Sequence, residues 1–144
     1  MALMESESTV RELLRTAKLL RLCMEEALAE AGGSFAIFVI LDAVNLEPGL
    51  SQRDIARRLS IEGPSVTRHL DHLEAEGLIE RRGDPTDRRL TRVFLTDAGK
   101  ERYLALCPIV HSQEEALFAD TDPAQVETFR SLLHDLHTRL RERD

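Results

Sequence analysis

The stretch Gly63–Leu95, GPSVTRHLDHLEAEGLIERRGDPTDRRLTRVFL, decides the fold of this 144-residue chain. Pro64 suits the first turn of a helix, and Gly77 suits the left-handed residue that follows a helix end. The spacing between them therefore predicts a helix of about three to four turns. Its apolar residues recur at i, i+4 and i+7 and form one stripe that faces a core: Val66, Leu70 and Leu73.

A second face of this helix carries hydrogen-bonding side chains at i, i+3, i+4 and i+7: Ser65, Arg68, His69 and His72. A helix in the major groove must offer such groups to base edges and phosphates, whereas a carboxylate there would be repelled. The nearby acids Asp71, Glu74 and Glu76 lie off this face or late in the helix. We therefore expect a DNA-reading helix, with an ordinary solvated amphipathic helix as the alternative.

Two strands, residues 78–82 and 91–95, are expected after the helix, joined by a loop rich in turn residues. A long loop with Arg88 and Arg89 at its tip costs more entropy than a purely structural hairpin requires. Its charge suits a phosphate backbone or a narrow minor groove. The alternative is a solvated turn in which the arginines pair with Asp84 and Asp87; if Asp87 holds one arginine, the other stays free.

The part of the chain before residue 63 reads as three helices. Apolar residues at alternating steps of three and four predict a helix over residues 10–31. Ser34 can cap a second helix, residues 35–46, which is apolar all round and therefore central, although its β-branched part also permits a strand. Ser51 starts a short helix over residues 51–59, which forms a helix-turn-helix with the helix after Gly63.

Two helices are expected after the hairpin. Thr96 can cap one that runs from Asp97 toward Phe118, and Asp122-Pro123 is a strong start for the last one. This last helix repeats apolar residues at steps of three and four: Val126, Phe129, Leu133, Leu136 and Leu140. One compact domain cannot bury two such long end helices, so we expect them to pair with those of a second copy. Packing of the two against each other within one chain is the alternative.

Composition limits the function classes. The net charge is −7, yet residues 51–95 hold nine arginines against eight acids, so the acidic excess lies outside the expected DNA-binding segment. No apolar run reaches the roughly 20 residues of a membrane helix, and Glu5 and Glu7 interrupt any signal-peptide pattern. We expect a cytoplasmic protein that does not contact membranes. No nucleophile–base arrangement and no phosphate-binding glycine loop is present, so we expect no enzyme.

Cysteine and histidine residues offer only weak candidates for sensing. Cys23 and Cys107 lie far apart, and an inert buried thiol is the favoured interpretation of each over an oxidation switch. A metal site is conceivable but disfavoured against solvated or core histidines, and no metal or cofactor is expected. Its ligands would be His111, His134 and His137 with Glu114 or Glu115.

The runs SVTRHLDHLEAEGLIER (Ser65–Arg81) and DPTDRRLTRVFLTDAG (Asp84–Gly99) resemble the winged-helix core of the multiple-antibiotic-resistance regulator (MarR) family. The resemblance implies a mainly α fold with a small β-hairpin wing, as one domain over residues 1–144. Residues 35–95 would form the winged helix-turn-helix, flanked by dimerisation helices at residues 10–31 and 97–143.

The same resemblance implies a homodimeric transcriptional regulator, usually a repressor, that binds an inverted-repeat operator in double-stranded DNA. A small-molecule inducer or an oxidant would release the DNA. The implied DNA-binding residues are Ser65, Thr67, Arg68, His69, His72, Arg88 and Arg89, and Asp87 is implied to position a wing arginine. A winged-helix module that binds proteins rather than DNA is the alternative.

Overall fold

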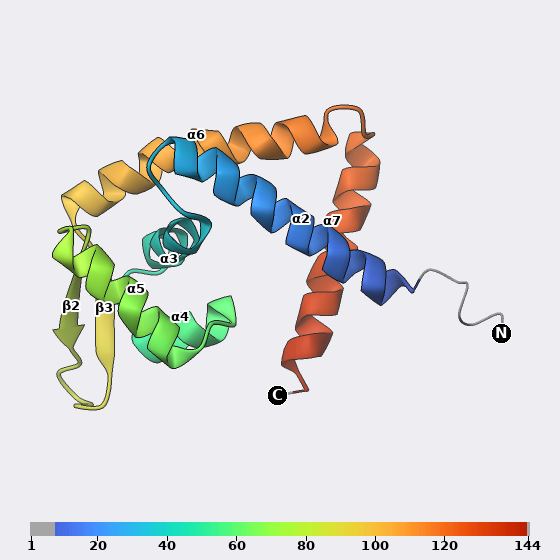
Figure 1. Cartoon of the computed structure of the whole chain (residues 1–144). Helices are drawn as coiled ribbons and strands as arrows, with labels where there is room; N and C mark the ends of the chain where they lie inside the picture. Colours follow the sequence, from blue (N-terminus) through green and yellow to red (C-terminus); the bar gives the residue numbers. More distant parts are fainter. Residues whose placement is uncertain (1–7, 144) are drawn as a thin grey trace. The chain divides into compact units, whose positions relative to one another are not determined.

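The computed structural model describes residues 8–143. Residues 1–7, which bear on the signal-peptide expectation, lie outside this range. The chain divides into two compact units, of which the first ends at Val110 and the second begins at His111. The elements, in order, are α2 (Thr9–Glu30), α3 (Phe35–Leu46), β1 (Leu50–Ser51), α4 (Gln52–Leu59), α5 (Gly63–Ala75), β2 (Ile79–Gly83), β3 (Thr91–Leu95), α6 (Asp97–Phe118) and α7 (Pro123–Arg141) (Figure 1).

Side-chain caps at the predicted positions begin four of the helices. The Ser34 hydroxyl accepts a hydrogen bond from the Ile37 N–H at 3.1 Å, and the Ser51 hydroxyl accepts one from the Asp54 N–H at 3.0 Å. Thr96 and Asp122 cap the last two helices in the same way, by accepting from the N–H groups of Gly99 and Ala124. Each cap satisfies a backbone donor that would otherwise lack a partner. The expected helices are confirmed.

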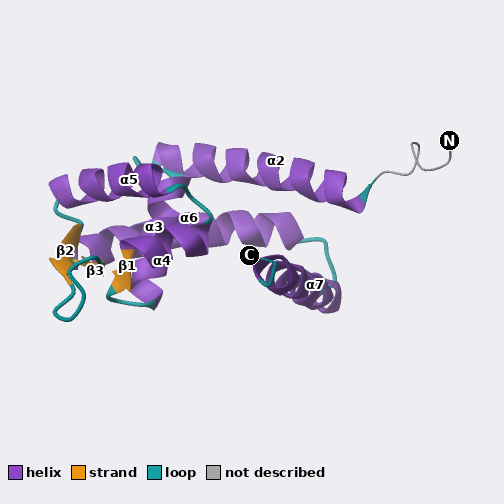
Figure 2. Ribbon diagram, turned by 90° about the horizontal axis from the view of Figure 1, so that it is seen from below, coloured by secondary structure: helices purple, strands orange, loops and turns teal. Residues whose placement is uncertain are grey.

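The sheet has three antiparallel strands in the order β1–β3–β2, and the loop between β2 and β3 extends away from it (Figure 2). The hairpin was expected, but β1 was not. Leu50 of β1 pairs with Val93 of β3, and the preceding Gly49 donates its N–H to the Val93 carbonyl at 3.0 Å. Gly49 has φ of +87°, which a residue with a side chain adopts only under strain.

The first unit holds two clusters of buried apolar side chains. The larger, which we call the main cluster, joins α3, α4, α5 and the sheet through Ile40, Leu41, Ala43, Val44, Leu50, Ile55, Val66, Leu70, Leu73, Ile79 and Val93. The smaller comprises Leu28, Phe38 and Leu106, with Tyr103 stacked on Phe38 at 5.9 Å between ring centroids. Tyr103 donates to the Asp42 carboxylate at 2.7 Å, and this bond raises the pKa of the phenol. Helix α3 therefore lies between the two clusters, as its all-apolar sequence predicts.

The junction between α5, β2 and α6 is unusually close. The Thr96 hydroxyl donates to the Gly77 carbonyl at 2.6 Å. A Cβ atom placed on Gly99, in the first turn of α6, would lie 1.9 Å from the carbonyl oxygen of Leu78. Only glycine therefore permits α6 to pass the residue that precedes β2 at this distance.

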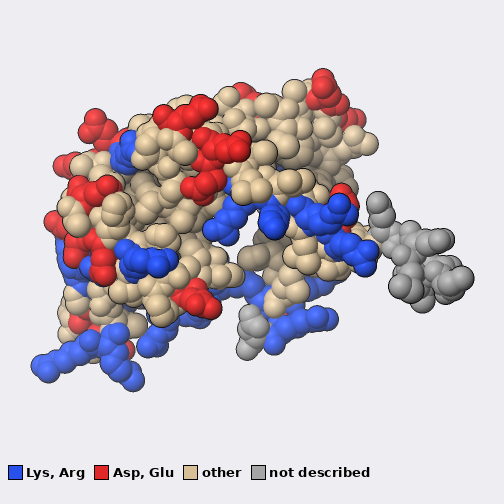
Figure 3. All heavy atoms as spheres, viewed as in Figure 1, with Lys and Arg blue, Asp and Glu red and all other residues tan. Residues whose placement is uncertain are grey.

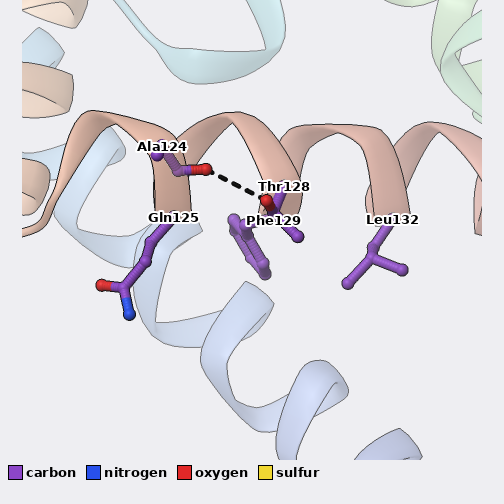
Figure 4. A pocket seen from close by; sticks show the side chains of 5 residues that line it. All are labelled: Ala124, Gln125, Thr128, Phe129 and Leu132. Atoms are coloured by element: carbon purple, nitrogen blue, oxygen red, sulfur yellow. Dashed lines mark hydrogen bonds between the residues drawn. The ribbon is translucent and has the colours of Figure 1, made fainter.

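Helices α2 and α7 each leave large apolar side chains exposed in the single chain. On α2 these are Val10, Leu14, Leu19, Leu20 and Leu22, and on α7 they are Phe129, Leu132, Leu133 and Leu140. None of the residues of α7 is buried. Phe129 and Leu132 point to the same side of α7 and line a shallow hollow of about 350 Å³ (Figure 4).

Candidate nucleic-acid interface

Helix α5 has one apolar and one polar face, as its sequence predicts. Val66, Leu70 and Leu73 are buried in the main cluster. Arg68 and His72 are exposed on the polar side, and Ser65 and His69 are partly exposed. The short link between α4 and α5 ends the first helix at Ser60, which has φ of +52°. The structure therefore places these four predicted DNA-binding residues on the accessible surface of the second helix of a helix-turn-helix.

The C-terminal end of this polar face lies beside one of the acids that the sequence places late in the helix. His72 Nε2 lies 3.3 Å from a carboxylate oxygen of Glu76, the residue that directly follows α5. Both side chains are more than half exposed, so the pair is a weak surface contact. Glu76 thus comes at the end of the helix, as expected, and the first turn of α5 carries no carboxylate. Arg68 lies nearer to that turn than His72 does and is better placed for base contacts.

Thr67 is exposed, but its hydroxyl is already engaged. It donates to the Gly63 carbonyl at 3.1 Å, the i−4 bond that threonine commonly makes in helices. The side chain therefore presents a methyl group and an oxygen acceptor to its surroundings rather than a free donor.

Asp84 organises the base of the wing. One of its oxygens accepts from the backbone N–H groups of Thr86 and Asp87 and from the Thr86 hydroxyl, at 2.7 to 2.9 Å. The other accepts from Arg92 Nε, and Arg92 also donates to the Gly49 carbonyl at 2.9 Å. The hydrogen bonds from Thr86 and Arg92 hold the pKa of Asp84 well below its usual range. The sequence alternative that paired Asp84 with the tip arginines is wrong, because Arg92 across the hairpin takes that place.

At the wing tip, Asp87 holds Arg89 and leaves Arg88 free. Asp87 accepts from the Arg89 backbone N–H at 3.0 Å and from its Nε at 3.2 Å, and these bonds lower the pKa of the carboxyl. The Arg89 side chain nevertheless remains 84% exposed. No hydrogen bond or ion pair within residues 8–143 involves the Arg88 guanidinium. The predicted division between a held and a free arginine is thus found at this loop.

Positively charged side chains gather at the wing. Lysine and arginine side chains project where Figure 1 places the loop between β2 and β3 (Figure 3). Arg82, near the loop end of β2, lies over the Phe94 ring at 4.6 Å and pairs with Glu80 at 2.8 Å. The hairpin therefore offers a projecting cationic surface beside the polar face of α5.

Sequence reasoning missed two residues of this region, Arg81 and Arg92. Both lie in strands and pair with acids distant in sequence: Arg81 with Asp71 and Glu74, and Arg92 with Asp84. The register of the hairpin, in which Arg82 stands opposite Arg92 and Gly83 opposite Thr91, brings Arg92 to Asp84. The packing of β2 beside α5 brings Arg81 to its two acids. Both arginines look like ordinary strand residues in the sequence, so only the tertiary structure indicates their partners.

The cysteines and histidines considered as sensors do not come together into a site within the described residues. Cys23 is exposed, so the expectation that it is a buried thiol is wrong for the single chain, and Cys107 is partly buried. Within residues 8–143, no three His, Cys, Asp or Glu side chains gather closely enough to hold a metal ion. His111 instead lies 3.3 Å from Glu115.

No single helix in the described chain is both long and apolar enough to cross a bilayer. Helices α2 and α3 meet the criteria only when taken together, and they are bent by 88° relative to each other.

Comparison with known proteins gives the region a family. Residues 36–90 match the sequence model of the MarR family. The uncharacterized HTH-type transcriptional regulator YdgJ of Bacillus subtilis (strain 168) is 47% identical over 53 residues, which are 37% of this chain and 32% of that protein. The match therefore spans about a third of the relative's length.

Solved structures share the fold over most of the chain. The S. aureus MepR–DNA complex superposes with a TM-score of 0.79 at 25% identity, covering 92% of this chain and 99% of that one. Wild-type MarR of E. coli, in its apo form, gives a TM-score of 0.78 at 22% identity over 92% and 98% of the two chains. Residues 36–90 therefore match the MarR family in sequence, and the chain has the winged helix-turn-helix fold, with its three-stranded wing, of these solved structures.

Proposed function

We propose that the chain is a homodimeric transcriptional repressor that recognises an inverted-repeat operator in double-stranded DNA. One observation carries the proposal: the exposed polar face of α5 and the cationic wing tip belong to one compact unit. The MepR structure, a DNA complex of the same fold, supports this interpretation. Its place of action would be the cytoplasm.

Each residue would have a distinct role. Arg68 would read a base, because its fork can engage guanine with two hydrogen bonds. Arg88 and Arg89 would bind the phosphate backbone or the minor groove, with Asp87 holding Arg89 in place. Ser65, Thr67, His69 and His72 would add contacts around Arg68.

The apolar faces of α2 and α7 support the dimer. Isolated apolar residues on a surface need no explanation, but two helices with long uncovered apolar faces do. Pairing with a second copy would cover them and place two α5 helices in successive major grooves about 34 Å apart. Residues 35–95 would then bind DNA, and residues 10–31 and 97–143 would form the dimer. A small ligand or oxidant acting on the dimer helices would shift that spacing and release the operator.

The experiment is selection of bound sequences from random DNA, followed by affinity measurements on the selected operator and on a scrambled duplex. Arg68→Ala should cost about 1–3 kcal/mol on the operator, roughly 5- to 150-fold in affinity, and much less on scrambled DNA. Arg89→Ala should weaken both duplexes similarly. Arg130→Ala, which removes an exposed arginine of α7 that pairs only locally with Glu127, is the matched control.

Salt dependence tests the competing protein-interaction module. A DNA-binding regulator that neutralises phosphates must lose affinity steeply as salt rises. If selection enriches no sequence and the residual binding does not depend on salt, the proposed function is wrong. Equal losses on both duplexes for Arg68→Ala would refute the role assigned to that residue.

A further inference from the structure

The guanidinium of Arg81 connects three elements of the DNA-binding unit. Arg81 belongs to β2, and its side chain is only 19% exposed. Its Nη2 lies 2.6 Å from Asp71 Oδ1 and 3.0 Å from Glu74 Oε1, both on α5. Its Nε and its backbone N–H donate to Glu74 Oε2 at 3.2 and 3.3 Å. A longer bond of 3.4 Å joins Nη1 to the side chain of Gln52, the first residue of α4.

These contacts engage a flank of α5 that the core does not hold. Asp71 and Glu74 are three residues apart and therefore neighbours on one side of the helix. The buried stripe of α5 faces the main cluster and resists displacement of the helix from the core. The Arg81 contacts, which lie to the side of that stripe, resist rotation of α5 about its own axis and tie that rotation to β2. Because β2 continues into the wing loop, one side chain relates the reading face to the wing.

Charge gives Arg81 a second effect. Two carboxylates beside a DNA-reading face would repel phosphates if they were unpaired. The hydrogen bond from Arg81 lowers the pKa of Glu74, because it stabilises the ionised carboxylate. Position 81 therefore requires the planar guanidinium of arginine and not simply a positive charge, since its acceptors lie on both α5 and α4.

We propose that Arg81 is a positioning residue that couples the recognition helix to the wing, so that Arg68 and Arg89 engage an operator half-site as one rigid unit. This inference rests on the proposed function. It assigns specificity to a side chain that would itself contact no DNA.

The test is a double-mutant cycle between Arg68→Ala and Arg89→Ala, measured as operator affinity in the full-length chain and again in an Arg81→Lys background. If the two surfaces are rigidly coupled, the double variant should lose at least about fivefold less affinity than the product of the single losses. Arg81→Lys keeps the charge and most of the stem but loses the fork. It should make the cycle additive and reduce the ratio of operator to scrambled affinity at least about tenfold. Arg130→Lys, an exposed arginine of α7, should change neither quantity.

A second variant separates positioning from folding and from charge. Glu74→Gln keeps the shape of the side chain but weakens its bonds to Arg81. Removal of a negative charge alone would raise affinity for both duplexes, whereas loss of coupling lowers the ratio between them. Reduced stability alone would scale both affinities equally and leave the cycle unchanged, and thermal unfolding measures that part.

The outcomes are distinct. An unchanged ratio and an unchanged cycle in Arg81→Lys and Glu74→Gln would overturn the inference while leaving the proposed function intact. A wild-type chain that prefers no sequence over scrambled DNA would overturn the proposed function, and this inference with it.

Discussion

Substitution of Leu132 by alanine should weaken the proposed dimer by an amount that follows from its exposure. Leu132 is 62% exposed in the single chain and lines the hollow on α7. Full burial of a leucine contributes about 1.5–3 kcal/mol, so covering the exposed part would contribute about 1–2 kcal/mol. A two-fold dimer contains the site twice, which gives about 2–4 kcal/mol and a roughly 30- to 1000-fold increase in dimer Kd.

Sedimentation of a dilution series measures that Kd directly. Thr138→Ala is the matched control, since Thr138 is also exposed on α7 but lies on the side of the helix opposite the apolar stripe. Its dimer Kd should remain within about threefold of wild type. Leu132 is also preferable to Phe129, because Phe129 packs against Phe118 at 6.5 Å and its removal would disturb the second unit itself.

Two results would refute the reasoning. If wild-type protein sediments as a single chain at tens of micromolar, α7 does not form the dimer. If the dimer forms and Leu132→Ala leaves its Kd unchanged, the hollow on α7 lies outside the interface, and another surface must cover the exposed residues of α2.

Two further predictions concern the DNA-binding unit. Thr67→Val should leave operator affinity within about threefold of wild type in a gel-shift titration, because the hydroxyl donor is spent on the Gly63 carbonyl and the methyl is retained; a loss beyond tenfold would show that this hydroxyl contacts DNA. Hydrogen bonds from Thr86 and Arg92 lower the pKa of Asp84 in the folded state. The ionised carboxylate therefore contributes fully to stability above about pH 4, the ordinary aspartate pKa. This contribution is lost as the pH falls through the lower pKa of the folded state. The Tm of the wild type should therefore fall more steeply in acid than that of Asp84→Asn, and parallel curves would contradict this assignment.

Local signals in the sequence were sufficient for the helices. Serine and threonine caps, Pro64 and the glycine after α5 act within a few residues, so their effect is legible without the fold. The buried stripe of α5 was predicted for the same reason, because helical periodicity alone determines which side chains share a face. The pairing of Asp87 with Arg89 is equally local, at two residues' separation.

Long-range pairing accounts for what the sequence did not show. Strand β1 has only two residues, too few for any alternation, and its partner Val93 lies more than 40 residues later. Asp84 was paired with arginines near it in sequence, whereas the hairpin register brings Arg92 to it. Cys23 lies among aliphatic residues, which favoured burial, but much of the face they share on α2 is uncovered in the single chain.

The close passage of Gly99 over the Leu78 carbonyl has a mechanical consequence. With no side chain between them and the Thr96 hydroxyl bonded to Gly77, the start of α6 and the root of the hairpin have no room to slide independently. A twist applied to the first turn of α6 should therefore also move Leu78, the residue that precedes β2. Gly99→Ala would force these two backbones apart and weaken the coupling between α6 and the hairpin.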